Sequence, residues 1–465
     1  MSLSQIYCDP AKVSKEDKDA LLGSLSQLDS KLFDQVQEAI NFSSNASQSE
    51  VSQLPSSSFF SLSKDDSSYI NETKQRELSK LGLDLISKGQ VAVLLMAGGQ
   101  GSRLGSSDPK GTYVIDIPSK SSLFELQAKR ILKLQELANG VIHWYVMASG
   151  PTREKTEAFF KEKNFFGLKP ENVTFFNQGT LPAFTKDGKQ IYRSAKNTLV
   201  ESPDGNGGLY KAIHDSNLLE DFKKRGIMHI HMYAVDNCLA KVADPLFIGF
   251  AVENNFDLAT KVVRKNEPTE SVGLIISKQG KPSVIEYSEI SDELACKKDE
   301  NNQELLYLRA ANIVQHYYSV DLLEKMVPVW ISSREYLPYH IAKKKIPHLT
   351  LEDEYVKPTA VNGIKLEQFI FDIFPSIELS KFGSLEVQRN EEFSPLKNGP
   401  GTKSDNPETS ASALKTLHTS WILANGGEIE KDGKVEIDAL LSYGGEGLEG
   451  VKGKVFKEDE YITSF

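Results

Sequence analysis

Cysteine is scarce in this chain, which contains only Cys8, Cys238 and Cys296. Their spacing matches neither a disulfide framework nor a set of zinc ligands. Long apolar runs are also missing: no uncharged apolar stretch is long enough to cross a bilayer, and residues 1–12 are polar, without the apolar core of a signal peptide. These absences argue against a disulfide-stapled secreted domain and an integral membrane protein. We therefore expect a cytoplasmic protein in a reducing compartment.

The chain has fewer basic than acidic residues, 54 Lys and Arg against 64 Asp and Glu, which gives a formal net charge of −10. A general nucleic-acid-binding role needs a basic face that releases counterions, so the composition argues against it. Anionic substrates of small size remain possible if a few lysines and arginines form a local basic pocket. The chain has 465 residues, of which 39% are hydrophobic and 25% charged. These values are typical of a globular protein with a large core and one or two smaller lobes.

The order of apolar segments predicts an α/β fold. Residues 10–40 and 71–87 have helical periodicity, and the serine-rich stretch 43–68 between them is expected to be a linker or loosely packed arm. Apolar runs of strand length then alternate with longer amphipathic stretches; they are Val91–Met96, Val141–Ala148, Val173–Phe176, Ile227–Val235 and Val272–Ile276. This alternation is typical of a Rossmann-like domain with a mostly parallel mixed sheet.

Three domains are expected from this reading. They are a small N-terminal helical lobe at 1–86, a catalytic domain at 87–400, and a small β-rich C-terminal lobe at 401–465, where the sequence becomes rich in glycine and acidic residues. In open sheets of this class, ligands bind beyond the carboxyl ends of the strands. The residues that follow each apolar run are therefore the first candidates for a functional site.

A glycine-rich loop follows the run Val91–Met96. It reads Ala97-Gly98-Gly99-Gln100-Gly101-Ser102-Arg103-Leu104-Gly105 and is followed by Pro109-Lys110. Glycines let a backbone approach a nucleotide and point N–H groups at phosphates, where a Cβ would block the way. Arg103 can bind phosphate through two hydrogen bonds, and Lys110 can act as a point charge. The loop therefore predicts binding of a polyphosphate.

Two better-known phosphate-binding motifs do not match this loop. A dinucleotide fingerprint, Gly-x-Gly-x-x-Gly, would need glycine at Leu104. A Walker loop would need Gly-Lys-Ser/Thr, but the chain has Pro109-Lys110-Gly111 there. The loop is neither a dinucleotide fingerprint nor a P-loop.

The loop resembles the signature of eukaryotic UDP-sugar pyrophosphorylases, in particular those that act on N-acetylglucosamine 1-phosphate. Further segments agree in the same order; they are Gln178-Gly179-Thr180-Leu181-Pro182, Pro203–Tyr210, Val235-Asp236-Asn237, Val284–Glu289, Asn362-Gly363-Ile364-Lys365 and Phe393–Asn398. The resemblance covers about residues 75–465. Two departures are visible: Ser102 stands where the family commonly has threonine, and Arg309-Ala310-Ala311-Asn312 replaces the usual Asn-Ala-Gly-Asn.

The resemblance implies a uridylyltransferase that joins UTP to N-acetylglucosamine 1-phosphate and releases UDP-N-acetylglucosamine and pyrophosphate, with Mg²⁺ as cofactor. It implies catalytic roles for Arg103, Lys110 and Lys397, and contacts to the nucleotide from Met96, Ala97, Gly98, Gly99, Gln178, Gly205 and Asp236. It implies contacts to the sugar phosphate from Asn206, Gly273, Glu286, Asn312, Phe369, Phe371 and Lys365. No nucleic acid, membrane or obligatory protein partner is expected.

The residues alone leave plainer interpretations open for several of these positions. Gln178 could be a solvated loop glutamine. Asp236 could cap a helix, although a carboxylate after a long strand also suits Mg²⁺, which prefers oxygen ligands. Phe369 and Phe371, two apart, could share one side of an extended segment at the site or in the core. Lone lysines such as Lys365 and Lys397 are usually surface residues.

Two alternative functions remain open at this stage. The same reaction could use glucose or galactose 1-phosphate, because hydroxyl contacts discriminate weakly between sugars unless polar groups are left unpaired. The chain could also be a non-catalytic protein that binds nucleotide sugars. The charged positions that the reaction requires are all retained, which favours the enzyme.

Overall fold

The structure is a computed structural model that describes residues 2–42 and 51–465. Two compact units are formed. The first comprises the described parts of Met1–Ser49 together with Gln178–Ile213 and Val327–Ile373, and the second those of Glu50–Asn177 with His214–Met326 and Phe374–Phe465. These units divide the chain differently from the three expected domains, which stay a prediction. Among the described residues, no helix combines the length and apolarity that a membrane span needs.

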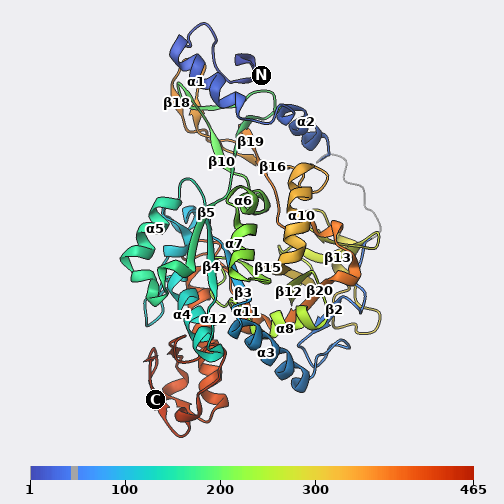
Figure 1. Ribbon diagram of the computed structural model, residues 1–465, viewed down its shortest axis with the longest axis vertical. Helices are drawn as coiled ribbons and strands as arrows, with labels where there is room; N and C mark the ends of the chain where they lie inside the picture. The colour runs from blue at the N-terminus through green and yellow to red at the C-terminus, as the bar shows by residue number, and fades with distance from the viewer. Residues whose placement is uncertain (1, 43–50) are drawn as a thin grey trace. The chain divides into compact units, whose positions relative to one another are not determined.

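The second unit contains a large mixed sheet (Figure 1). Along its main path the order is β2 (Phe59–Ser61), β20 (Phe382–Val387), β12 (Leu258–Arg264), β15 (Ala310–Ser319), β11 (His229–Ala234), β3 (Val91–Met96), β4 (His143–Ala148) and β5 (Val173–Asn177). Only β15 runs antiparallel to both its neighbours in this path. The predicted mostly parallel mixed sheet is confirmed. Three more strands join at its side; they are β1 (Val51–Ser52), β13 (Leu274–Lys278) and β14 (Lys281–Ile285).

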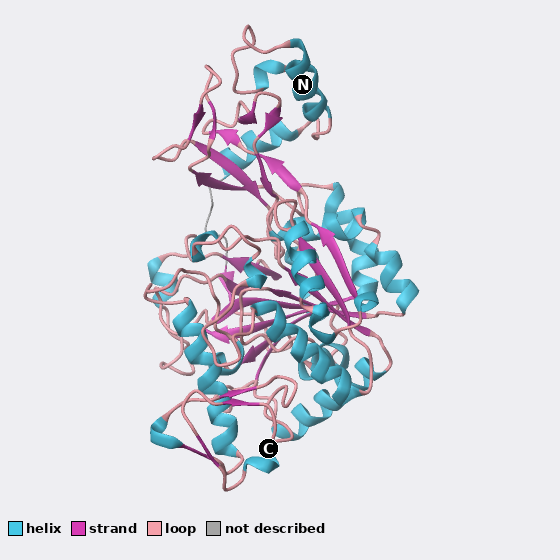
Figure 2. Ribbon diagram, turned by 90° about the vertical axis from the view of Figure 1, so that its left-hand side faces the viewer, coloured by secondary structure: helices cyan, strands magenta, loops and turns pink. Residues whose placement is uncertain are grey.

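Helices cover both faces of this sheet (Figure 2). The helices of the second unit are α3 (Glu72–Ser87), α4 (Leu123–Ala138), α5 (Arg153–Glu162), α7 (Leu218–Arg225), α8 (Pro245–Glu253), α9 (Asp292–Cys296), α11 (Arg389–Glu392) and α12 (Pro407–Ala424). On one face, α3 and α4 pack against buried side chains such as Val93 and Trp144. On the other, Phe222 of α7 contacts Tyr145 edge-on at 4.9 Å. Burial on both faces explains why the predicted strands are continuous apolar runs.

The C-terminal end of the chain, also in the second unit, combines α12 with two small parallel strand pairs. The pairs are β21 (Glu428–Ile429) with β23 (Val455–Phe456), and β22 (Glu436–Ile437) with β24 (Tyr461–Ile462). Glu436 accepts hydrogen bonds from the backbone and hydroxyl of Ser119. Lys129 of α4 pairs with Asp438 at 3.1 Å. These polar contacts attach the C-terminal residues to α4 and to the loop before it.

The first unit is built around small antiparallel sheets and two helices, α1 (Lys15–Ser26) and α2 (Leu32–Phe42). Its strands are β6 (Thr180–Pro182), β7 (Phe184–Thr185), β8 (Arg193–Ala195), β9 (Thr198–Leu199), β10 (Glu201–Pro203), β16 (His340–Lys344), β17 (His348–Leu349), β18 (Tyr355–Val356) and β19 (Gly363–Glu367). Helix α6 (Leu209–Asp215) begins in this unit and α10 (Val320–Ser332) ends in it. The helical periodicity predicted for residues 10–40 is confirmed by α1 and α2, whose Leu21, Leu25 and Val36 are buried in one cluster with side chains of this unit's strands.

The serine-rich stretch differs from its prediction where it is described. Residues 43–50 lie outside the described part of the chain, but 51–68 are not a loose arm. Strand β1 pairs with β13, and β2 pairs in parallel with β20, so this stretch adds strands to the sheet. Composition could not show this, because the pairing partners lie more than 200 residues away.

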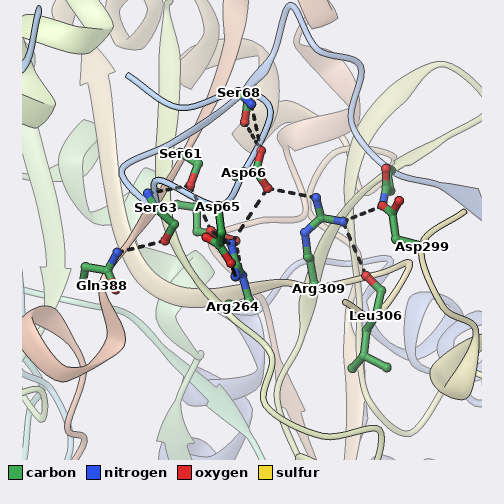
Figure 3. Close-up of polar contacts among 12 residues, drawn as sticks. Ser61, Ser63, Asp65, Asp66, Ser68, Arg264, Asp299, Leu306, Arg309 and Gln388 are labelled. Atoms are coloured by element: carbon green, nitrogen blue, oxygen red, sulfur yellow. Dashed lines mark hydrogen bonds and ion pairs between the residues drawn. The ribbon is translucent and has the colours of Figure 1, made fainter. Parts of the chain in front are cut away.

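Ion pairs and serine hydroxyls hold the same stretch in place (Figure 3). Asp66 lies 3.0 Å from Arg309 and 3.9 Å from Arg264. Burial acts to raise the pKa of Asp66, but hydrogen bonds from Ser68 and Arg309 outweigh it, so the pKa lies below its usual value. Arg309 also pairs with Asp299 at 2.9 Å. The arginine that departs from the family pattern therefore has a structural role here.

Candidate active site

The site is positioned by the strand order around β3. After β3 the chain continues to β4 on one side, while β11 lies parallel to β3 on the other side. Ligands bind in the crevice beyond the carboxyl ends of strands at such a reversal of direction. The glycine-rich loop follows β3, and Asp236 follows β11 by two residues. Both candidate segments therefore lie at the position that this sheet topology favours.

The glycine-rich loop is a closed turn. The Gly101 N–H donates to the Asp108 carbonyl at 3.0 Å, and the Lys110 N–H to the Gly99 carbonyl at 3.1 Å. The Gly98 carbonyl accepts from the Ser149 hydroxyl at 2.7 Å. A Cβ built on Gly99 would meet no protein atom within 4 Å, and its φ is not positive. The protein's own packing does not require glycine at 99, and the space beside it is open to a ligand that approaches the backbone.

Two predicted site residues meet directly across the strand ends. Lys110 Nζ lies 3.3 Å from Asp236 Oδ2, with 17% and 22% of their side chains exposed. A Cβ on Gly111 would lie 2.2 Å from the Phe124 ring, so the residue after Lys110 is packed tightly against α4. That packing holds Lys110 at the strand ends.

Asn237 ties a distant segment to the end of β11. Its buried amide nitrogen donates to the Glu392 carbonyl at 2.6 Å. Its oxygen accepts from the backbone N–H groups of Ser394 at 3.0 Å and Leu239 at 3.2 Å. A buried amide with three such partners holds its neighbours rigidly. The sequence reasoning missed Asn237 as a site-building residue.

The segment that Asn237 holds, residues 392–399, brings further predicted residues to the end of β11. The Leu396 N–H donates to the Asp236 carbonyl at 2.8 Å, so Lys397 follows one residue after a direct contact with Asp236. A Cβ on Gly399 would lie 2.7 Å from the Arg103 carbonyl oxygen. The backbone near Lys397 therefore packs against the glycine-rich loop beside Arg103.

Backbone contacts thus bring the segments that carry the three predicted catalytic cations together, and Lys110 contacts the Asp236 carboxylate directly. Arg103 is exposed and Lys397 is partly exposed. Within residues 2–42 and 51–465, neither of these two side chains makes an ion pair, while Lys110 pairs with Asp236. Two cations without an ion-pair partner in the described chain, beside a glycine-rich turn, are the kind of arrangement that attracts an anion.

Three residues assigned to the sugar meet at the ends of β13, β14 and β15. The Asn312 N–H donates to the Gly273 carbonyl at 2.9 Å. A Cβ on Gly273 would lie 2.8 Å from Glu286 Oε1, so this carboxylate lies directly against the glycine. Asn312 Oδ1 accepts from the backbone N–H of Val314, which has φ 55° beside a bulge in β15. A β-branched residue at positive φ is strained, and such strain is frequent at functional sites.

In the first unit, Gln178 contacts a buried carboxylate. Its Nε2 lies 3.3 Å from Asp204 Oδ1 and 3.4 Å from the Gly205 carbonyl. Burial raises the pKa of Asp204 to about 7, against hydrogen bonds that lower it. Cβ atoms on Gly208 and Gly179 would lie 2.0 and 2.7 Å from the Asp204 carboxylate, so glycines leave the space that it fills. Asp204 was not among the predicted site residues.

The Gly205 turn is locked to the loop after β19. Gly205 has φ 89°, and a Cβ there would lie 2.4 Å from the Gln368 carbonyl oxygen. The Gln368 N–H donates to the Asp204 carbonyl and its carbonyl accepts from Gly207, both at 2.8 Å. Asn206 Oδ1 accepts from the Ile370 N–H at 2.9 Å. Glycine is therefore required at 205 by both conformation and packing.

Phe369 and Phe371 lie in this loop, in a turn and not in the extended segment that their spacing suggested. Their ring centroids are nevertheless 5.1 Å apart, and His340 stacks on Phe369 at 4.2 Å. Lys365, in β19, is partly buried, and this burial together with Lys344 lowers its pKa. The first unit therefore brings Gln178, Gly205 and Asn206 together and places the two phenylalanines on the adjoining loop.

The residues that sequence reasoning missed are buried polar groups. Asn237 and Asp204 stand inside matched motifs, Val235-Asp236-Asn237 and Pro203–Tyr210, so position in a motif was the available signal. Nothing local distinguished them from the exposed Asn and Asp residues of ordinary turns. For the described residues, no group of three or more His, Cys, Asp and Glu side chains could hold a metal ion.

Comparison with known proteins agrees with this geometry. The family model described as UTP–glucose-1-phosphate uridylyltransferase matches residues 30–433. A protein of Saccharomyces cerevisiae named UDP-N-acetylglucosamine pyrophosphorylase is 54% identical over 97% of this chain and 95% of its own length. A human protein named UDP-N-acetylhexosamine pyrophosphorylase-like protein 1 is 42% identical over 81% of this chain and 78% of its own.

Solved structures are similar over the same range. The crystal structure of the Trypanosoma brucei uridine diphosphate N-acetylglucosamine pyrophosphorylase has a TM-score of 0.82 at 29% identity, covering 96% of this chain and 94% of that one. The crystal structure of a putative UDP-N-acetylglucosamine pyrophosphorylase from Entamoeba histolytica has a TM-score of 0.77 at 35% identity, covering 83% of this chain and 96% of that one. The sequence and the fold agree, and this chain belongs to the UTP–glucose-1-phosphate uridylyltransferase family.

Proposed function

We propose that this chain is a UDP-N-acetylglucosamine pyrophosphorylase. It transfers the uridylyl group of UTP to N-acetylglucosamine 1-phosphate and releases UDP-N-acetylglucosamine and pyrophosphate. The observation that carries the proposal is the contact between Lys110 and Asp236 at the ends of β3 and β11, with the glycine-rich loop and the segment before Lys397 packed beside it. Relatives over most of the chain's length carry this enzyme's name.

The reaction needs little covalent chemistry from the protein. A phosphate oxygen of the sugar 1-phosphate attacks the α-phosphorus of UTP in line, and the bond from that phosphorus to the bridging oxygen of pyrophosphate breaks. The attacking phosphate is already ionised at neutral pH, so no general base is required. What the chain must supply is the positioning of two anions and the neutralisation of charge on the α- and β-phosphates.

The cations and amides around Asp236 have the right character for this task. The loop N–H groups of Gly98 and Gly99 would contact phosphate oxygens, with Met96 and Ala97 beside the nucleotide; the Ala97 N–H itself donates to the Met147 carbonyl at 2.8 Å. Arg103 and Lys397 carry charges without an ion-pair partner in the described chain, so their charge is available to phosphates. Lys110 would stabilise the charge that builds on the phosphates during attack.

Recognition of the base and sugar is proposed for the remaining residues. Gln178 and Gly205 would contact uracil. The oxygen of Asn206 is occupied by the Ile370 N–H, so the group it offers is an amide donor, which suits an N-acetyl carbonyl. Glu286, Asn312 and the Gly273 backbone would bind sugar hydroxyls, with Phe369 and Phe371 as apolar contacts and Lys365 as a cation on the sugar-phosphate side.

Mg²⁺ is the proposed cofactor, with Asp236 as its protein ligand. Magnesium keeps several waters and is often held by one or two carboxylates together with substrate phosphates. The single, partly exposed carboxylate of Asp236 fits that mode, whereas a cage made only of protein ligands would not fit it. When bound, the ion would neutralise phosphate charge and orient the triphosphate.

The proposal is tested by pyrophosphate release from UTP with N-acetylglucosamine 1-phosphate, glucose 1-phosphate or galactose 1-phosphate, each with Mg²⁺ or with EDTA. We expect rapid release with the N-acetylated sugar and at least about tenfold slower release with the other two, because Asn206 would lose its acceptor. EDTA should abolish release. Equal rates with glucose 1-phosphate would contradict the N-acetyl assignment, and binding of nucleotide sugar without release would show a non-catalytic protein.

A further inference from the structure

The contact between Gln178 and Asp204 determines which way the Gln178 amide faces. An amide side chain can present either its oxygen or its nitrogen to a base edge, and the two ends recognise opposite groups. Gln178 lies two residues before β6 and is buried, with 9% of its surface exposed. Its orientation is therefore set by its protein neighbours and not by solvent.

Both neighbours on one side of this amide are acceptors. The Gly205 carbonyl, 3.4 Å from Nε2, can only accept, and the Asp204 carboxylate, 3.3 Å from Nε2, accepts when ionised. Turning the amide over would place its oxygen against the Gly205 carbonyl oxygen in every protonation state, and against a second acceptor whenever Asp204 is ionised. The nitrogen must therefore face Asp204 and Gly205, and the oxygen faces the opposite way. No hydrogen bond to that oxygen is present among the described residues.

Two glycines leave the space that the Asp204 carboxylate occupies. A Cβ on Gly208 would lie 2.0 Å from Asp204 Oδ1, and one on Gly179 would lie 2.7 Å from Oδ2. Side chains at either position would push the carboxylate away from Gln178. Burying a carboxylate costs free energy of folding. A buried carboxylate that two glycines accommodate therefore suggests a functional role for Asp204.

We propose that Asp204 is a positioning residue that fixes the Gln178 amide with its oxygen towards the base, and thereby makes the site select uracil over cytosine. This rests on the proposed function, in which Gln178 contacts the base. Uracil presents an N3–H donor, which an amide oxygen accepts. Cytosine presents an unprotonated N3 at the same position, which would face that oxygen lone pair to lone pair.

The test is the ratio of kcat/KM for UTP to that for CTP, measured on one preparation with N-acetylglucosamine 1-phosphate. The concentration of folded enzyme cancels in this ratio, so partial misfolding of a variant does not affect it. Asp204→Asn offers a donor as well as an acceptor and permits the flipped amide, so we expect the ratio to fall at least about tenfold. Gly179→Ala, which displaces the carboxylate and leaves both polar side chains intact, should lower it in the same direction.

Gln178→Ala separates this inference from the proposed function. It should lower the ratio by itself, and Asp204→Asn should then have no further effect in the Gln178→Ala background, because Asp204 acts only through Gln178. An unchanged ratio in both Asp204→Asn and Gly179→Ala, with a lowered ratio in Gln178→Ala, would overturn the positioning role and leave base contact by Gln178 standing. A wild-type ratio in Gln178→Ala would overturn base contact itself, and no turnover of UTP by the unaltered chain would overturn the proposed function.

Discussion

Lys110→Ala is expected to lower kcat for pyrophosphate release by about 100-fold or more, the usual loss when one preorganised group that stabilises transition-state charge is removed. Lys110 is held at the strand ends by the packing of Gly111 on Phe124 and lies 3.3 Å from Asp236. The KM for UTP should change less than kcat, because the charge that Lys110 neutralises is greater in the transition state than in bound UTP. Steady-state kinetics at saturating Mg²⁺ measures both values.

The chain offers a matched control for this change. Lys155 pairs with Asp108 at 2.6 Å near the same loop, but 53% of the Lys155 side chain is exposed. Surface ion pairs contribute little, so Lys155→Ala should stay within about twofold of the unaltered chain. Turnover by Lys110→Ala within that same twofold range would refute phosphate stabilisation by Lys110.

Asp236→Asn is expected to reduce activity by about 100-fold or more and to raise the Mg²⁺ concentration that gives half-maximal rate. The substitution keeps the shape of the side chain and one oxygen, but removes the negative charge that a hard cation prefers in its ligands. The backbone contact of Asp236 with Leu396 does not depend on the side chain, so the fold around Lys397 should be retained. A Mg²⁺ titration of the initial rate measures the shift.

Asp108→Asn is the corresponding control, since it removes the charge of an exposed carboxylate in the glycine-rich loop that pairs with Lys155 at 2.6 Å. Its Mg²⁺ titration should match that of the unaltered chain. If Asp236→Asn lowered the rate but left the Mg²⁺ midpoint unchanged, Asp236 would act through its pairing with Lys110 and not as a metal ligand.

Local sequence patterns were sufficient for the elements that carry the site. The apolar run Val91–Met96 is a strand with the predicted bounds. The predicted helix before it is capped by Asn71, whose side chain accepts from the Lys74 N–H at 3.0 Å. The rule that ligands bind beyond strand ends then pointed to the glycine-rich loop and Asp236. The contact of Lys110 with Asp236 is consistent with this rule, because the two residues follow β3 and β11, which are adjacent parallel strands.

Long-range pairing limited what could be predicted. Strand β2 depends on β20, more than 300 residues away, and Asp66, which follows β2, depends on Arg264 and Arg309. The partners of Asn237 and Asp204 are likewise chosen by tertiary packing, and a buried polar side chain has the same local sequence signal as an exposed one. Positions whose role depends on such partners become visible only in the folded chain.

The most direct test of the account is isotope exchange between labelled pyrophosphate and UTP, measured with and without UDP-N-acetylglucosamine. Direct attack by the sugar phosphate predicts that label enters UTP only when the nucleotide sugar is present, because no uridylyl group is ever held on the protein. Label entering UTP from pyrophosphate and UTP alone would show a covalent uridylyl intermediate and contradict in-line transfer. No label in UTP under either condition would contradict the proposed reaction itself.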